Sequence, residues 1–214
     1  QAEDGIRDRS PSRGLGDVYK RQDLVIAEEV AVPARRVFRV ADSASRKSPG
    51  QLDYGGPLYT CPWRTTAILV LAAPVIGAAK AAVRRFQERV DDHFLVALGA
   101  TQRNDPAAGY RLAESTAEIL AAELLLYDAA ARLDQLGAAE EVDQLVNASI
   151  VRDCGWGVKA LSTAVDRLYE ASGSNAMRVD EPIQRLWRDV NAARSHAILT
   201  WDHAANIYGK ALLR

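Results

Sequence analysis

TTAILVLAAPVIGAA, residues 65–79, is the stretch that decides the fold. It is 15 residues long, carries Pro74 in its middle, and runs into Lys80, Arg84 and Arg85. About 20 consecutive apolar residues are needed to cross a bilayer, so this stretch is too short for a membrane span. We therefore expect it to begin a long helix that is buried in a globular protein.

Helical spacing of apolar residues continues from this stretch to the end of the chain. Asp105 and Pro106 form an N-cap and first-turn pair, and Gly137 is a plausible helix stop. In the helix between them one face is expected to carry Leu112, Ile119, Leu120, Leu124 and Tyr127. The pattern predicts helices over about 63–90, 106–136 and 138–169, and a fourth from about 182 through Trp201. Four long helices with short connections predict a mainly α fold, a four-helix bundle of roughly 150 residues.

The chain upstream of residue 63 has a different pattern. DLVIAEEVAVP, residues 23–33, is rich in β-formers, and RVFRV, residues 36–40, suggests a second extended piece. A lone strand or hairpin is not stable by itself, so these residues are expected to be the remnant of a larger sheet. Residues 43–62 are rich in Ser, Gly and Pro, which predicts a linker.

The first 22 residues show no apolar period. GIRDRSPSRGLGDVYKRQ, residues 5–22, resembles translated adapter sequence at the end of an open reading frame; the alternative is a basic arm. The predicted organisation is a non-native segment over 1–22, remnant strands and a linker over 23–62, and a helical bundle over 63–214.

Composition excludes several function classes. Of the 214 residues 48% are hydrophobic and 26% charged, and the net charge of −1 offers no basic excess for nucleic acid or an anionic membrane. Cys61 and Cys154 are too few for a disulfide framework, and we expect reduced thiols in a cytoplasmic protein. Phosphate-binding glycine motifs and metal-binding Cys or His motifs are absent from the sequence, and no metal is expected.

Polar and titratable residues are densest over residues 172–209. The loop of Ser172, Gly173, Ser174 and Asn175 offers hydroxyl, amide and backbone N–H groups to a polar ligand, or is a simple turn between helices. On the following helix Arg185 and Asp189 form an i,i+4 pair. His196 is expected to face a low-polarity interior as a catalytic group; the alternative is a satisfied core or surface histidine. His203 is expected to be exposed.

Three motifs together resemble the C-terminal part of the acyl-CoA dehydrogenase-like flavoproteins: DLVIAEEVAVPARRV, LAAPVIGAAKAAVRRF, and SGSNA followed by EPIQRLWRDVNAARSHAILTWD. The resemblance is closer to the branch of reduced-flavin-dependent monooxygenases, which includes the oxygenase components of p-hydroxyphenylacetate hydroxylase and secosteroid phenol hydroxylase. In the dehydrogenases a glutamate that serves as general base lies eight residues after the aspartate of the RD pair. Counting from Asp189, that position is Ala197, beside His196, and alanine cannot take a proton.

The resemblance implies a two-component monooxygenase. A separate reductase supplies reduced FMN or FAD, a flavin hydroperoxide forms, and oxygen passes to a phenol-like aromatic substrate. His196 would act catalytically near the flavin and substrate, because an imidazole can stabilise the oxygenated flavin or assist phenol deprotonation near neutral pH. The resemblance implies a homotetramer in which a neighbouring subunit supplies part of the cofactor contacts. The residues expected to contact the cofactor are Ser172, Gly173, Ser174, Asn175 and Arg188. An alternative for Arg188 and Asp189 is an ion pair that locks helices.

Two alternatives remain open at this point: a fragment of an acyl-CoA dehydrogenase, and a helical oligomerisation module without chemistry. The family also has an N-terminal helical domain and a full β domain before the position of Asp23. The sequence is therefore expected to be a fragment that is inactive by itself.

Overall fold

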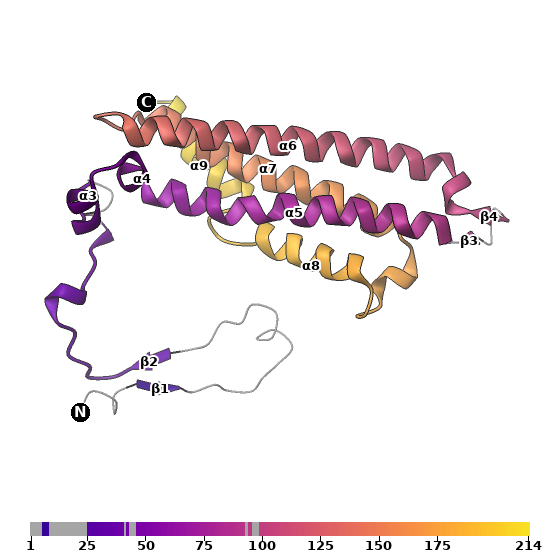
Figure 1. Ribbon diagram of the computed structural model, residues 1–214, viewed down its shortest axis with the longest axis horizontal. Coiled ribbons are helices and arrows are strands. Elements are labelled where there is room, and N and C mark those ends of the chain that lie inside the picture. The colour runs from indigo at the N-terminus through magenta and orange to yellow at the C-terminus, as the bar shows by residue number, and fades with distance from the viewer. Residues whose placement is uncertain (1–5, 9–24, 41, 43–45, 93, 96–98) are drawn as a thin grey trace. The chain divides into compact units, whose positions relative to one another are not determined.

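The computed structural model describes residues 1–214 except 1–5, 9–24, 41, 43–45, 93 and 96–98 (Figure 1). The chain divides into two compact units, Gln1–Val40 and Ala41–Arg214. In the first unit β1 (Ile6–Asp8) pairs antiparallel with β2 (Val25–Ala27), with Arg7 opposite Ile26. Among the described residues of the predicted strand, 25–33, a strand is present at 25–27. It pairs with residues of the 1–22 segment, which was expected to be non-native.

The second predicted extended piece, over 36–40, is wrong. Pro33 is instead the N-cap of η1, a short 3-10 helix over Ala34–Arg36. Because Pro33 holds φ at −58° and has no N–H to give a strand ladder, it favours the start of a helical turn over continued pairing.

The segment over 43–62 is more than a linker, because it contains α3 (Pro49–Tyr54) and α4 (Pro57–Thr60). Both helices begin at a proline, and Ser48 forms a capping box with Gln51 in front of α3. The Ser, Gly and Pro residues that predicted a linker therefore mark helix starts. Arg46 donates to the carbonyls of Leu136 at 2.6 Å and Ala139 at 2.7 Å, so this segment caps the end of a long helix of the bundle.

Three long helices confirm the first three predicted helices: α5 (Trp63–Asp92), α6 (Pro106–Ala138) and α7 (Gln144–Ala171). The Asp105 carboxylate accepts from the backbone N–H of Ala107 at 3.0 Å, as the predicted N-cap requires. Asp143 caps α7 in the same way. Between α5 and α6 lie β3 (Phe94–Leu95), which pairs antiparallel with β4 (Ala100–Thr101), and η2 (Gln102–Asn104).

The fourth predicted helix is instead two helices, α8 (Pro182–Arg194) and α9 (Trp201–Leu212), preceded by η3 (Ser174–Met177). A turn over residues 195–200 separates them. The Ser195 hydroxyl donates to the carbonyl of Asn191 at 2.8 Å, and Leu199 is buried in the core. Burial of Leu199 redirects the chain where the apolar spacing alone predicts a continuous helix.

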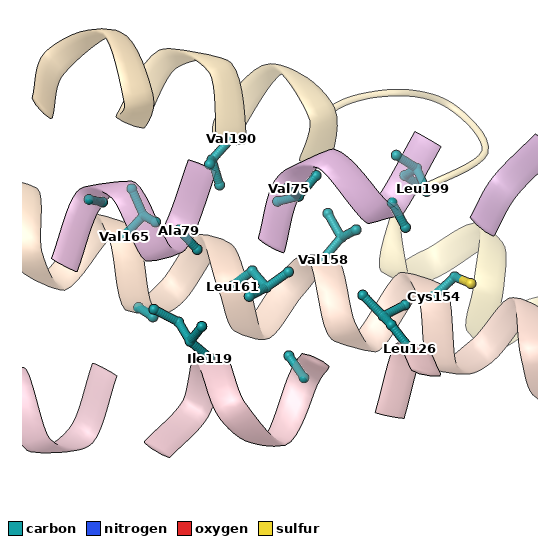
Figure 2. Close-up of a cluster of buried hydrophobic side chains, with 14 of the residues drawn as sticks. Val75, Ala79, Ile119, Leu126, Cys154, Val158, Leu161, Val165, Val190 and Leu199 are labelled. Atoms are coloured by element: carbon teal, nitrogen blue, oxygen red, sulfur yellow. The ribbon is translucent and has the colours of Figure 1, made fainter. Parts of the chain in front are cut away.

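The core runs along the inner faces of these helices (Figure 2). In Figure 2, Val75 and Ala79 of α5 and Ile119 of α6 point toward Leu161 of α7. Leu199 enters the same cluster from the turn after α8. The bundle architecture predicted from the sequence is confirmed.

Two details of the predicted helices are wrong. Gly137 does not stop α6, which continues to Ala138. A side chain at this position would clash with the carbonyl oxygen of Pro57, so glycine is required there for close packing against α4. On α6 the buried stripe contains Ile119 and Leu126, while Leu120, Leu124 and Tyr127 are exposed. The buried face of α6 therefore lies about one residue position away from the face predicted from the sequence.

The length argument against a membrane span does not hold for α5. Its 30 residues are long and apolar enough to cross a membrane, and 33% of its most apolar window is buried. The buried residues Ile68, Ala72 and Phe86 of α5 belong to the bundle core, as expected of a core helix.

Candidate functional site

The loop over 172–175 divides into a buried and an exposed part. The side chain of Ser172 is fully buried, and its hydroxyl donates to the carbonyl of Leu168 at 2.8 Å. Gly173 has φ of 70°, a left-handed conformation that favours glycine, and turns the chain into η3. Ser174 and Asn175 are exposed. Of the four predicted residues, the side chains of Ser174 and Asn175 are therefore the ones that a ligand can reach.

Asn175 lines a cleft of about 540 Å³, which we call the arginine cleft. This volume lies within the range of small-molecule sites. Charged side chains dominate the lining, which comprises Arg85, Glu88, Arg89, Asn175, Arg178, Asp180, Glu181, Pro182 and Ile183. The end of α5, η3, the loop over 178–181 and the start of α8 contribute these residues, so the cleft joins segments that are about 90 residues apart in the sequence.

The guanidinium groups of the arginine cleft differ in how they are paired. Arg85 pairs with Glu88 at 2.7 Å, and Arg178 with Asp180 at 2.9 Å. The Arg178 guanidinium holds the pKa of the Asp180 carboxyl below its ordinary value. Arg89 is different, because its closest carboxylate oxygen, on Glu181, is 3.9 Å away.

Arg89 also carries the unusual polar atoms of the cleft. Its Nε and Nη2 atoms are buried and have no hydrogen-bond partner among the described residues. Buried donors are normally paired, and an unpaired one costs free energy. The positive charge of Arg89 at the wall of the cleft suits an anionic ligand such as a phosphate, and its buried N–H groups would reach such a ligand after a change of side-chain rotamer.

His196 does not face the interior, contrary to the prediction. It lies in the turn between α8 and α9 with an exposed side chain. Its Nδ1 atom accepts from the backbone N–H of Ile198 at 3.5 Å. The physical reason is the split of the predicted helix. Helical spacing gives the direction of a side chain only within a helix, and His196 lies in a turn.

His203 was expected to be exposed, but it is half-buried and lines a second cavity. This cavity of about 320 Å³ is mainly apolar and is called the Trp63 cavity here. Its polar lining groups include Asn147, whose Oδ1 accepts from the Thr65 hydroxyl at 2.7 Å. The lining residues are Trp63, Arg64, Thr65, Ala67 and Ile68 of α5, Asn147 and Val151 of α7, Ile198, and His203 and Ile207 of α9.

The Trp63 cavity and the His196 turn are neighbours, because Ile198 belongs to both. The arginine cleft lies toward the other end of α5. Arg85 follows Ile68 by 17 residues in α5, which is about 25 Å at 1.5 Å per residue. One chain therefore carries two separate concave sites, a charged one and an apolar one.

Arg188 and Asp189 lie on the exposed side of α8. Asp189 Oδ2 and Arg185 Nε form an ion pair at 3.8 Å, which confirms the predicted i,i+4 pair. This pair lies within one helix and is exposed, so Asp189 does not use it to lock two helices together. The flavin contact expected of Arg188 stays a prediction.

The two cysteines are buried and free, as expected. Burial raises the pKa of the Cys61 thiol and raises that of Cys154 to about 12, so neither is a thiolate near neutral pH. Among the described residues no group of three or more His, Cys, Asp or Glu side chains is placed to hold a metal ion.

Comparison with known proteins identifies relatives of the whole helical region. Residues 69–201 match the family described as acyl-CoA dehydrogenase, C-terminal domain. Over 199 residues the chain is 32% identical to the flavin-dependent monooxygenase oxygenase subunit HsaA of Rhodococcus jostii, covering 92% of this chain and 51% of that protein. It is 30% identical to the oxygenase component of an FADH(2)-dependent resorcinol hydroxylase of Rhizobium, covering 88% of this chain and 49% of that protein.

A solved structure gives the same result. XiaF from Streptomyces, in complex with FADH2 and glycerol, superposes with a TM-score of 0.84 at 25% identity, covering 98% of this chain and 53% of that one. The chain spans about half the length of the curated relatives it matches.

Proposed function

The chain belongs to the acyl-CoA dehydrogenase C-terminal domain family, and from this premise we propose that it is part of the oxygenase component of a flavin-dependent monooxygenase. The proposed reaction is hydroxylation of a phenol-like aromatic substrate, with reduced FMN or FAD from a separate reductase. One observation carries the proposal over a dehydrogenase. The turn over 195–200, beside the Trp63 cavity, contains His196 and no carboxylate that could serve as the dehydrogenases' general base.

The arginine cleft fits the phosphate of a reduced flavin. Arg89 supplies a positive charge and buried N–H donors that a rotamer change would turn toward the phosphate, and Asn175, which also lines the cleft, supplies an amide. Ser174, at the start of η3, is exposed beside Asn175 and is a further contact. FMN and FAD both carry a phosphate after the ribityl chain, so the cleft suits either one. When bound, the reduced flavin supplies the activation of dioxygen.

The Trp63 cavity fits the aromatic ring of the substrate. It is mainly apolar, and Trp63 and Ile198 offer surface for ring contacts. Asn147 and His203 place polar groups in the same wall, where they can orient a hydroxyl group. His196, next to Ile198, would hold or move the proton of the phenol, since imidazole titrates near neutral pH.

The distance between the two proposed sites supports a model in which one flavin is shared by two copies of the chain. In both FMN and FAD only the five-carbon ribityl chain separates the ring from the first phosphate, which is far less than the roughly 25 Å along α5. If both sites serve one flavin, a flavin with its phosphate in one arginine cleft would have its ring near the Trp63 cavity of another copy. This supports a homo-oligomer, and we propose the tetramer expected from the family, acting in the cytoplasm without nucleic acid or membrane.

The shared site gives the proposal a concentration test. Binding of anaerobically reduced FMN, measured by equilibrium dialysis, should strengthen as the chain concentration rises through the range in which sedimentation velocity detects self-association. A binding constant that is the same for monomer and oligomer would contradict the shared site.

Because the chain is expected to be inactive by itself, the reaction is tested in its full-length parent, with resorcinol, reduced FMN and isotopically labelled dioxygen. We expect one labelled oxygen atom in the product, and loss of that product in His196→Ala with reduced flavin still bound. Retention of the product in His196→Ala would remove the assigned role. Reduction of bound FAD by butyryl-CoA, with no hydroxylation, would instead identify a dehydrogenase.

A further inference from the structure

One carboxylate on α7 receives three side chains of α8. The Oδ1 atom of Asp166 accepts from Trp187 Nε1 at 2.7 Å and from Asn191 Nδ2 at 2.9 Å. Its Oδ2 atom accepts from Arg194 Nη1 at 3.2 Å. The Trp187 ring also stacks on Tyr169 of α7, with centroids 4.7 Å apart. Hydrogen bonds to an ionised acceptor are stronger than neutral ones, so this is the dominant polar contact between α7 and α8 in the described chain.

The spacing of the three donors makes this contact sensitive to the rotation of α8. Residues 187, 191 and 194 are four and three positions apart, so they lie on one stripe of the helix. A small rotation of α8 about its axis would move all three away from Asp166 together. The apolar contacts of α8 come from the buried Ile183 and Val190, with Leu186, Trp187 and Ala193 partly buried against the same core, and the Asp166 contacts add a directional restraint to this packing.

Arg194 is the last residue of α8, and His196 follows two residues later. The amides of His196, Leu199 and Thr200 are held by local hydrogen bonds within residues 193–200. The place of this turn therefore depends on where α8 ends. Asp166 itself is not among the described lining residues of the arginine cleft or the Trp63 cavity. Its carboxylate therefore binds side chains of α8 and does not face a ligand.

We propose that Asp166 is a positioning residue, which fixes the rotation of α8 and thereby holds the His196 turn beside the Trp63 cavity. The catalytic meaning of this position rests on the function proposed above for His196. The positioning itself is a property of the unliganded chain and is tested without flavin.

The test compares Asp166→Ala and Asp166→Asn with the unchanged chain and with Asp128→Asn. Asp128 is a matched control, because it also pairs with an arginine, Arg132, but is 63% exposed and lies on α6. Hydrogen exchange of the amides of residues 195–200 is measured beside that of the core of α5 and α6. The ring resonances of His196 and His203 are recorded by NMR.

In Asp166→Ala we expect exchange at the amides of His196, Leu199 and Thr200 to be at least about tenfold faster, with core exchange unchanged. The His196 resonance should shift, while that of His203, which lies on α9, should not. Asp166→Asn should be intermediate, because its amide oxygen still accepts from Trp187 and Asn191. Asp128→Asn should match the unchanged chain.

Equal exchange at these amides in Asp166→Ala and the unchanged chain would overturn the proposal. An equal acceleration throughout α5, α6 and α7 would also overturn it, because it would indicate a general structural role. If Asp166→Ala does not fold, Asp166→Asn is decisive by the same comparison with Asp128→Asn. A positive result here with full hydroxylation by His196→Ala would refute only the role proposed for His196. A positive result here with no hydroxylation by the unchanged protein would refute the proposed function alone.

Discussion

Gly155 is the point of closest approach between α7 and α9, and its substitution by alanine gives a sharp test of the packing. A Cβ at Gly155 would lie 2.5 Å from the Cβ of Ala204. Carbon atoms in contact prefer about 3.5–4.0 Å, so α9 would have to move by about 1 Å. Ala204 is adjacent to His203, so the same movement would disturb the Trp63 cavity.

The magnitude follows from two opposing effects. Overpacking a core by one methyl group costs about 1–3 kcal/mol, while alanine is favoured over glycine inside a helix by about 1 kcal/mol. Gly155→Ala should therefore lower the free energy of unfolding by up to about 2 kcal/mol. Gly109→Ala in α6 is the matched control, because no heavy atom of the described chain lies within 4 Å of its Cβ. It should raise the free energy by up to about 1 kcal/mol.

The assay is urea unfolding of both variants, supported by thermal unfolding, in which about 1 kcal/mol corresponds to about 2–4 °C for a chain of this size. The double variant Gly155→Ala with Ala204→Gly should recover most of the loss, because it removes the second methyl group. Equal midpoints for Gly155→Ala and Gly109→Ala would refute the close approach of α7 and α9. A double variant that is no more stable than Gly155→Ala would refute the contact with Ala204.

Three further outcomes are expected. Asp105→Ala should lower the free energy of unfolding by about 1 kcal/mol in urea, because it removes the N-cap of α6. Arg46→Ala should destabilise by about 1–2 kcal/mol and speed hydrogen exchange around Leu136, because the last carbonyls of α6 lose their donor. Burial raises the pKa of the Cys154 thiol to about 12 in the folded chain, against an ordinary value of 9.0. The protonated thiol therefore contributes fully to the free energy of unfolding below pH 9, and this contribution is lost as the pH rises toward 12. Stability in urea should therefore fall less steeply over that interval in Cys154→Ala, and an identical pH dependence would refute this assignment.

The long helices could be predicted from the sequence because local and tertiary signals agree. The N-cap Asp105 and the spacing of buried residues both indicate α6. The split between α8 and α9 could not be predicted, because the apolar spacing continues through Ile198 to Trp201 without Gly or Pro. Burial of Leu199 in the core decides the break, and that is a tertiary effect.

The candidate site was predictable only in part. The exposed position of Asn175 follows from its turn-forming neighbours. Arg89 was not predicted, because in the sequence it is one of several charged residues near the end of α5. Its distinction is the lack of close partners, which depends on Glu181 from a distant part of the sequence. His196 and His203 were given opposite exposures, since both were placed on one uninterrupted helix.

The most direct test of the proposed flavin site is the affinity of the chain for anaerobically reduced FMN in Arg89→Gln. Arg103→Gln is the control, because Arg103 is an exposed arginine that pairs with Asp91 at 3.0 Å and is not among the lining residues of the arginine cleft. A lost hydrogen bond to a charged group corresponds to about a tenfold to hundredfold weaker affinity. We predict that loss for Arg89→Gln and unchanged affinity for Arg103→Gln; equal affinities in the two variants would contradict the flavin site.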